Sequence, residues 1–174
     1  MSTAFGNDPP TPGGRWRVIA IVTIAMQVSY WPVVATIVQG DLPDDVVAAG
    51  VFVGLGAVPF VFMLAAFASR HPSAPWAVVR AMGLFAIVGV SVGILHVAAG
   101  MAAGYAAGGL ATLPPPTVGR PWPARIAMFV AVTVSVTLIL AVAPVVGLVL
   151  AAVLPFLALG LADRLGAGQV HTPR

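Results

Sequence analysis

The sequence has few charged residues, and this scarcity excludes a soluble protein. Aspartate, glutamate, lysine and arginine make up 7% of the 174 residues. Soluble domains carry about 25% charged residues, so this chain has too little charge to cover a surface that faces water. Because 60% of the residues are also hydrophobic, we predict an integral membrane protein.

Cysteine, lysine and glutamate are absent. The lack of cysteine excludes disulfides, thiolate metal sites and cysteine nucleophiles. The basic residues are all arginine and the acidic residues all aspartate. With the abundant alanine, glycine and proline, this bias is typical of a GC-rich bacterium such as an actinobacterium, and we expect the protein in the cytoplasmic (inner) membrane. The arginines flank apolar runs, which indicates membrane orientation and no nucleic-acid partner.

Four long intervals without a charged residue mark the expected membrane spans. They are residues 18–40, 46–69, 81–119 and 126–162, with lengths of 23, 24, 39 and 37 residues. A spanning helix needs about 20 apolar residues, so the first two intervals each hold one span. Each of the others is long enough for two, because 37 helical residues would extend about 55 Å across a hydrocarbon core of about 30 Å.

The local sequence suggests where the two longer intervals divide. Ala143-Pro144 separates two apolar runs, and proline disfavours helix at the residue before it. The third interval holds an apolar run as far as His96, followed by a Gly- and Ala-rich segment that ends at Pro114-Pro115-Pro116. The alternatives are one kinked helix in the last interval and a loop over 98–113.

The distribution of arginine favours an all-α membrane protein with six transmembrane helices in three hairpins. The expected helices run approximately over 18–38, 46–68, 79–96, 98–113, 125–142 and 145–162. With both termini in the cytoplasm, every arginine lies on the cytoplasmic side, which is the side that basic residues favour. Four or five spans, the alternatives, leave Arg120 and Arg125 outside.

We expect one transmembrane domain over residues 15–165, between two short tails. Residues 1–14 are rich in Pro, Gly, Ser and Thr and predict a disordered tail, and 166–174 form a second tail. The first apolar run has about 21 residues, whereas the apolar part of a signal peptide has about 7–15. We therefore predict that this run is retained as a transmembrane helix.

The polar residues inside the expected spans are the candidate functional residues. Gln27, Ser29 and Tyr30 cluster in the first span, and His96 lies near the end of the third. A transport path would need such residues, because polar groups are costly in lipid and persist there for function. The simpler interpretations are interhelical hydrogen bonds for the cluster and a position at the membrane interface for His96.

Glycines at four-residue spacing predict close helix packing. Gly100, Gly104 and Gly108 follow one another in the fourth expected span, and Gly50 and Gly54 in the second. Small residues at this spacing let two helix backbones approach closely. We expect these glycines to lie at helix–helix contacts.

The sequence gives no indication of catalysis. Asp41, Asp44 and Asp45 form the acidic cluster, and the helix dipole at the start of the second span explains it better than a metal site does. The sequence has no P-loop, serine-hydrolase or dinucleotide-binding motif. We therefore predict that the protein is not an enzyme and has no catalytic residue, cofactor or metal ligand.

The expected function is that of a small non-catalytic subunit. It would scaffold or stabilise a larger envelope complex, such as a lipid or solute transporter or a respiratory assembly, through helix packing. Its expected partners are membrane lipids and other integral membrane subunits. The alternative is a small oligomeric transporter or channel with a polar path near Gln27, Tyr30 and His96.

Overall fold

The computed structural model describes residues 12–113 and 121–168, and every regular element within them is an α-helix. The helices are α1 (Pro12–Val38), α2 (Asp44–Ala68), α3 (Ala74–Gly93), α4 (Val97–Thr112), α5 (Pro121–Val142) and α6 (Pro144–Gly168). The all-α class expected from the sequence is confirmed.

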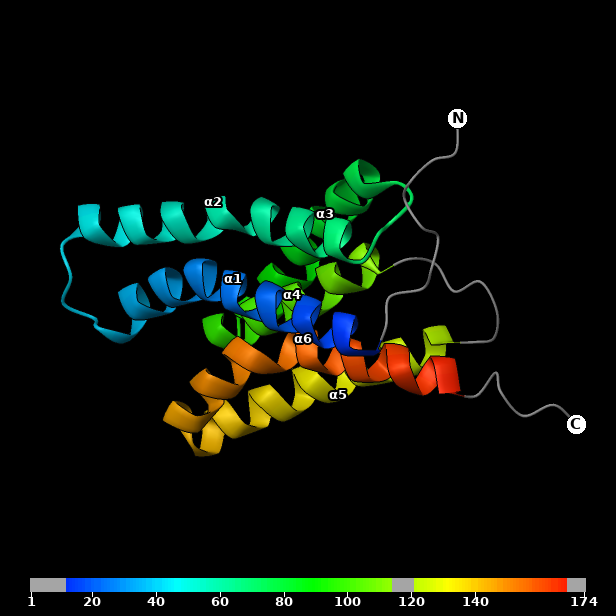
Figure 1. Ribbon diagram of the computed structural model, residues 1–174. Coiled ribbons are helices and arrows are strands. Elements are labelled where there is room, and N and C mark those ends of the chain that lie inside the picture. The colour runs from blue at the N-terminus through cyan, green and yellow to red at the C-terminus, as the bar shows by residue number, and fades with distance from the viewer. Residues whose placement is uncertain (1–11, 114–120, 169–174) are drawn as a thin grey trace, which may run out of the picture.

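Consecutive helices run antiparallel and form three hairpins, α1–α2, α3–α4 and α5–α6 (Figure 1). Within the third hairpin, Ala143 is the single residue between the two helices, and Pro144 begins α6. Proline suits the first turn of a helix, where its missing N–H would have no carbonyl partner. The break expected at Ala143-Pro144 is therefore confirmed.

Several helix ends differ from the expected ones. α1 begins at Pro12, so residues 12–14 are helical where the sequence predicted a disordered tail. α6 continues to Gly168, so residues 166–168 are also helical. Hydropathy marks only the part of a helix inside the membrane, whereas backbone hydrogen bonds continue beyond it. The other parts of the two expected tails, 1–11 and 169–174, lie outside the described residues.

Three further helix boundaries, the two ends of α3 and the start of α5, differ from those expected from the sequence. α3 begins at Ala74 and ends at Gly93, although the sequence predicted 79–96. His96 is not its last residue but has an extended backbone immediately before α4. α5 begins at Pro121, before the expected residue 125. The expected spans began at charged residues or apolar runs, whereas proline in the first turn determines two of these starts.

Five of the helices, α1, α2, α3, α5 and α6, are long and apolar enough to cross a membrane. Large hydrophobic side chains cover their outer faces. Phe52 on α2 and Ile94 after α3 are each 81% exposed. So much exposed apolar surface would be unfavourable in water and suits contact with lipid. The chain is accordingly a multi-pass membrane protein.

α4 is the central helix of the bundle, and Figure 1 shows it among the others. It contacts all five other helices, and 13 of its 16 residues are buried. A helix of this length extends about 24 Å, less than the hydrocarbon core of about 30 Å. Because the other helices surround it, α4 needs small side chains for packing more than it needs hydrophobicity.

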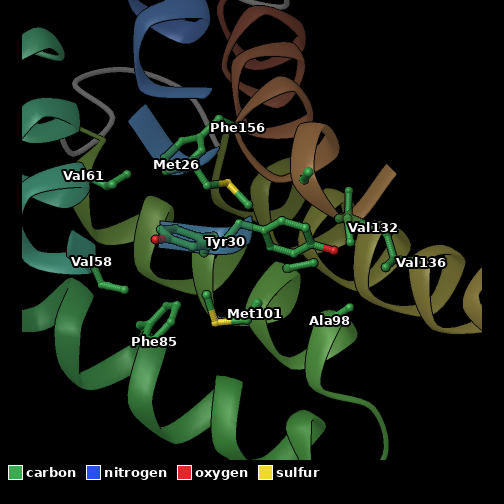
Figure 2. Close-up of a cluster of buried hydrophobic side chains, with 14 of the residues drawn as sticks. Met26, Tyr30, Val58, Val61, Phe85, Ala98, Met101, Val132, Val136 and Phe156 are labelled. Atoms are coloured by element: carbon green, nitrogen blue, oxygen red, sulfur yellow. The ribbon is translucent and has the colours of Figure 1, made fainter. Parts of the chain in front are cut away.

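An aromatic cluster joins four of the helices at the centre. The ring of Tyr105 on α4 lies 5.6 Å from that of Phe62 on α2, 5.1 Å from that of Phe85 on α3 and 6.0 Å from that of Phe156 on α6. Figure 2 shows Phe85 and Phe156 among the buried side chains of this core. Such pairs contribute about 0.5–1.5 kcal/mol each beyond the burial of their area.

The described arginine side chains gather toward one end of the bundle, and three of the aspartates lie at the other. Because the helices alternate in direction, the starts of α1, α3 and α5 share one end with the ends of α2, α4 and α6 (Figure 1). The described arginine side chains lie at or near this end, which we call the arginine end: Arg17, Arg70, Arg80, Arg125 and Arg164. Asp41, Asp44 and Asp45 lie at the other, the aspartate end.

Candidate functional site

Gln27 and Tyr30 connect α1 to the backbone of α6. They lie three residues apart and so share one face of their helix. Nε2 of Gln27 donates a hydrogen bond of 2.8 Å to the carbonyl oxygen of Ala152. The hydroxyl of Tyr30 donates one of 2.9 Å to the carbonyl oxygen of Leu148. These two bonds hold α1 against α6 at two successive turns.

The Gln27 amide is also bonded within α1. Nε2 donates to the carbonyl oxygen of Thr23 at 2.8 Å, and Oε1 accepts a hydrogen bond of 2.8 Å from Nε1 of Trp31. An amide side chain offers two N–H donors and one oxygen acceptor, and all three functions are used here. Gln27 therefore fixes the rotation of α1 about its own axis.

Ser29 on α1 and Tyr105 on α4 bring two buried hydroxyl groups together. Both residues are fully buried, and the side chains lie close enough to interact. Neither hydroxyl reaches hydrogen-bonding geometry with a partner among the described residues. The sequence pointed to Ser29 but missed Tyr105, although this tyrosine is conspicuous as a large polar side chain within a run of alanine and glycine.

His96 lies apart from the polar cluster of α1 and makes a different kind of contact. Its side chain is exposed and lies at the aspartate end, at the start of α4. Nδ1 accepts a hydrogen bond of 3.2 Å from the backbone N–H of Ala98. The first N–H groups of a helix have no carbonyl partner within the helix, so a side chain that accepts from one of them stabilises the start. His96 is thus the N-cap of α4.

Three of the four glycines of α4 face α3 at very short range. A Cβ atom placed on Gly100 would lie 2.5 Å from the carbonyl oxygen of Gly89, and one on Gly104 would lie 2.8 Å from Cδ2 of Phe85. A Cβ on Gly108 would lie 2.8 Å from the carbonyl oxygen of Ala81. Ordinary carbon contacts are about 3.5–4.0 Å, so only glycine fits these positions without a shift of the neighbouring atoms.

Two of the three glycines of α2 pack against α1 in the same way. A Cβ atom on Gly54 would lie 2.6 Å from the carbonyl oxygen of Ser29, and one on Gly50 would lie 3.1 Å from that of Pro32. The close approach of α2 therefore occurs next to the polar cluster of α1. Small residues on α2 allow the helix pair to pack at this distance.

Arg125 is a buried charged side chain that the sequence presented only as a marker of topology. It lies in the second turn of α5 and is 2% exposed. Its guanidinium carbon lies 5.3 Å from the centre of the Trp122 ring. An aromatic face within about 6 Å attracts a cation, and this contact accompanies the burial of Arg125 in the protein.

A cavity of about 150 Å³ lies near the arginine end, between α1, α2, α4 and α6. Val22, Ala65, Gly109 and Phe156 line it, one from each of these helices. Arg164 is the charged residue that the described part of the chain contributes to the lining. Sequence analysis could not find this cavity, because its walls come from helices far apart in the chain.

Aromatic and backbone contacts hold two of the polar side chains of the cavity lining. The guanidinium carbon of Arg164 lies 4.7 Å from the centre of the Trp16 ring, which places the cation over an aromatic face. The hydroxyl of Thr112 donates a hydrogen bond of 2.8 Å to the carbonyl oxygen of Gly109. Arg164 therefore supplies the positive charge of the cavity.

No protein-family model, curated protein or solved structure matches this chain. Within residues 12–113 and 121–168, no group of three or more His, Cys, Asp or Glu side chains is placed to hold a metal ion.

Proposed function

We propose that the protein is a small non-catalytic subunit that scaffolds or stabilises a larger membrane assembly, such as a lipid or solute transporter or a respiratory complex. The use of its interior polar side chains supports this most directly. Gln27 and Tyr30 donate to the backbone of α6 at 2.8 and 2.9 Å, so they join helices and are not held ready for a substrate.

Helix packing gives the second line of support. Lipid removes most of the hydrophobic drive between membrane helices, so their association depends on close van der Waals contact and interhelical hydrogen bonds. Gly100, Gly104 and Gly108 bring α4 against α3 at the distances such contact needs. A bundle built in this way presents a large apolar outer surface, which suits a subunit that packs against other membrane proteins.

The proposal includes six crossings of the bacterial cytoplasmic membrane, with both termini in the cytoplasm. α4 runs antiparallel to α3 and α5, so the described arginines share one end. Basic residues favour the cytoplasmic side. α4 is short for a bilayer, but burial by its neighbours removes the need to match the hydrocarbon thickness.

The alternative, a small oligomeric transporter or channel, would need a path lined by Gln27, Tyr30 and His96. Two of these side chains bind to the backbone of α6, and the imidazole of His96 caps α4. These contacts favour the subunit role. Saturable flux of a solute through vesicles that contain only this protein would favour the channel.

Native purification tests the subunit role. The protein, tagged after Arg174, is extracted in mild detergent and the proteins that accompany it are identified. We expect a larger integral membrane protein in a fixed ratio to the tagged chain. The ratio should persist in Asp41→Asn, which changes an exposed loop residue, and fall in Gly104→Leu. Recovery of the wild-type protein without any such partner would contradict the proposal.

A further inference from the structure

We propose that the cavity at the arginine end binds a single-chain anionic lipid, with its acyl chain inside the bundle and its carboxylate or phosphate group at Arg164. The proposal concerns a ligand site and does not depend on the subunit role. It is supported by the size of the cavity, the polarity of its described wall and the position of Arg164 in that wall.

Polarity changes along the cavity from apolar to positive. Along α6, Phe156 lies two turns before Arg164, so Phe156 is deeper in the bundle and Arg164 is closer to its end. Arg164 is exposed, whereas Ala65 and Phe156 are 3% and 6% exposed. A chain with an anionic head matches this gradient, with its apolar part toward the deep wall and its head at the guanidinium.

The size of the cavity suits part of one acyl chain. An apolar cavity of about 150 Å³ stays dry and binds a small hydrocarbon such as benzene. From Phe156 to Arg164, α6 rises by about 12 Å, so an extended chain can reach from the deep wall to the charge. Water is a poor occupant, because a buried water needs two to four polar partners and the deep wall is apolar.

The charge selects an anionic head over a neutral one. Among the described residues of the lining, Arg164 is the one that carries a charge, and the ring of Trp16 lies under its guanidinium at 4.7 Å. This contact orients the planar group, and guanidinium binds carboxylate and phosphate oxygens in two-point geometry. The arginine end is also where a lipid head would lie if this end faces the membrane surface.

Binding of dodecanoate tests the proposal, with 1-dodecanol as the neutral probe of the same chain length. The full-length protein in phosphatidylcholine nanodiscs is titrated with each probe, and the number of probe molecules bound per protein chain is measured. We expect saturable binding of one dodecanoate per chain and at least tenfold weaker binding of dodecanol, because one charge-assisted hydrogen bond has about this effect on affinity.

Four variants distinguish binding of dodecanoate in the cavity from nonspecific attraction of dodecanoate to the surface of the protein. Arg164→Gln should weaken dodecanoate binding about tenfold, and Arg164→Lys should restore most of it. Ala68→Leu, which adds volume at the cavity wall, should abolish binding. Arg17→Gln removes an exposed arginine that does not line the cavity and should leave binding unchanged.

Three outcomes would overturn the proposal. One is the absence of saturable dodecanoate binding in a wild-type protein that is folded, as shown by its thermal unfolding. Another is equal binding of dodecanol, which would mean that the head is not recognised. The third is an equal loss of affinity in Arg17→Gln and Arg164→Gln. The purification experiment that tests the subunit role does not depend on any of these binding measurements. The subunit role and the lipid site can therefore be refuted separately.

Discussion

The approach of α4 to α3 at Gly100 offers the sharpest test of the packing, because one added methyl group must move two helices. A Cβ atom there would lie 2.5 Å from the carbonyl oxygen of Gly89, 2.5 Å from Cα of Gly93 and 2.7 Å from N of Gly93. All three atoms belong to the backbone, so no side-chain rotation relieves the contact. The helices would have to separate by about 1 Å to restore an ordinary distance of about 3.5 Å.

The magnitude follows from two opposing terms. Overpacking by an extra carbon costs about 1–3 kcal/mol, whereas alanine is favoured over glycine within a helix by about 0.5–1 kcal/mol. Gly100→Ala should therefore lower the free energy of unfolding by up to about 2.5 kcal/mol. Gly83→Ala on α3 is the matched control, because a Cβ there meets nothing within 4 Å.

Reversible unfolding by sodium dodecyl sulfate in mixed micelles, followed by circular dichroism, measures both variants. Gly83→Ala should be neutral or more stable than the wild type, and Gly100→Ala should be less stable. Gly104→Leu should be more damaging still, because its larger side chain meets the ring of Phe85. The packing described for α4 is refuted if Gly100→Ala proves as stable as Gly83→Ala.

The remaining predictions concern side chains on the helices and in the loops. Tyr30→Phe removes the hydrogen bond to Leu148 and should lower the free energy of unfolding by about 0.6 kcal/mol, and by no more than about 1.7; an unchanged value would show that the bond adds nothing. Asp41→Asn should change it by less than about 0.5 kcal/mol, because the side chain is exposed; a larger loss would indicate an unrecognised role for this carboxylate. Burial and then the charge of Arg80 hold the pKa of His71 below 6.5. The neutral imidazole is therefore favoured in the folded protein, and this stability is present above pH 6.5 and lost as the pH falls through the lower folded pKa. Arg80→Gln should raise the pKa of His71 in an NMR titration, and an unchanged titration would exclude the influence of that charge.

Hydropathy, charge spacing and proline together predicted the six helices and the break at Ala143-Pro144. These are local properties of the chain, so no knowledge of contacts was needed. The glycine spacing over 98–113 also indicated a packed helix rather than a loop, because small residues at this spacing form a flat helix face that a second helix can approach closely. α4 is such a helix, at the centre of the bundle.

The features that depend on the assembled bundle were not predictable. Tyr105 and its three aromatic neighbours come from four helices, and no pattern in the sequence relates them. The burial of Arg125 and the cavity at Arg164 also arise from contacts between distant segments. The helix ends at Pro12 and Gly168 were missed for another reason, since hydropathy reports the membrane and not the extent of backbone hydrogen bonding.

The account depends most on α4 as the sixth crossing, and labelling of single cysteines tests this directly. The chain has no cysteine, so Gln39→Cys, Ser73→Cys and Val142→Cys, at exposed positions, can each be labelled alone with a membrane-impermeant maleimide. In intact spheroplasts we expect Gln39→Cys and Val142→Cys to be labelled, and Ser73→Cys to be labelled only after permeabilisation. Labelling of Val142→Cys and Ser73→Cys from the same side would show that α4 does not cross, and would contradict the account.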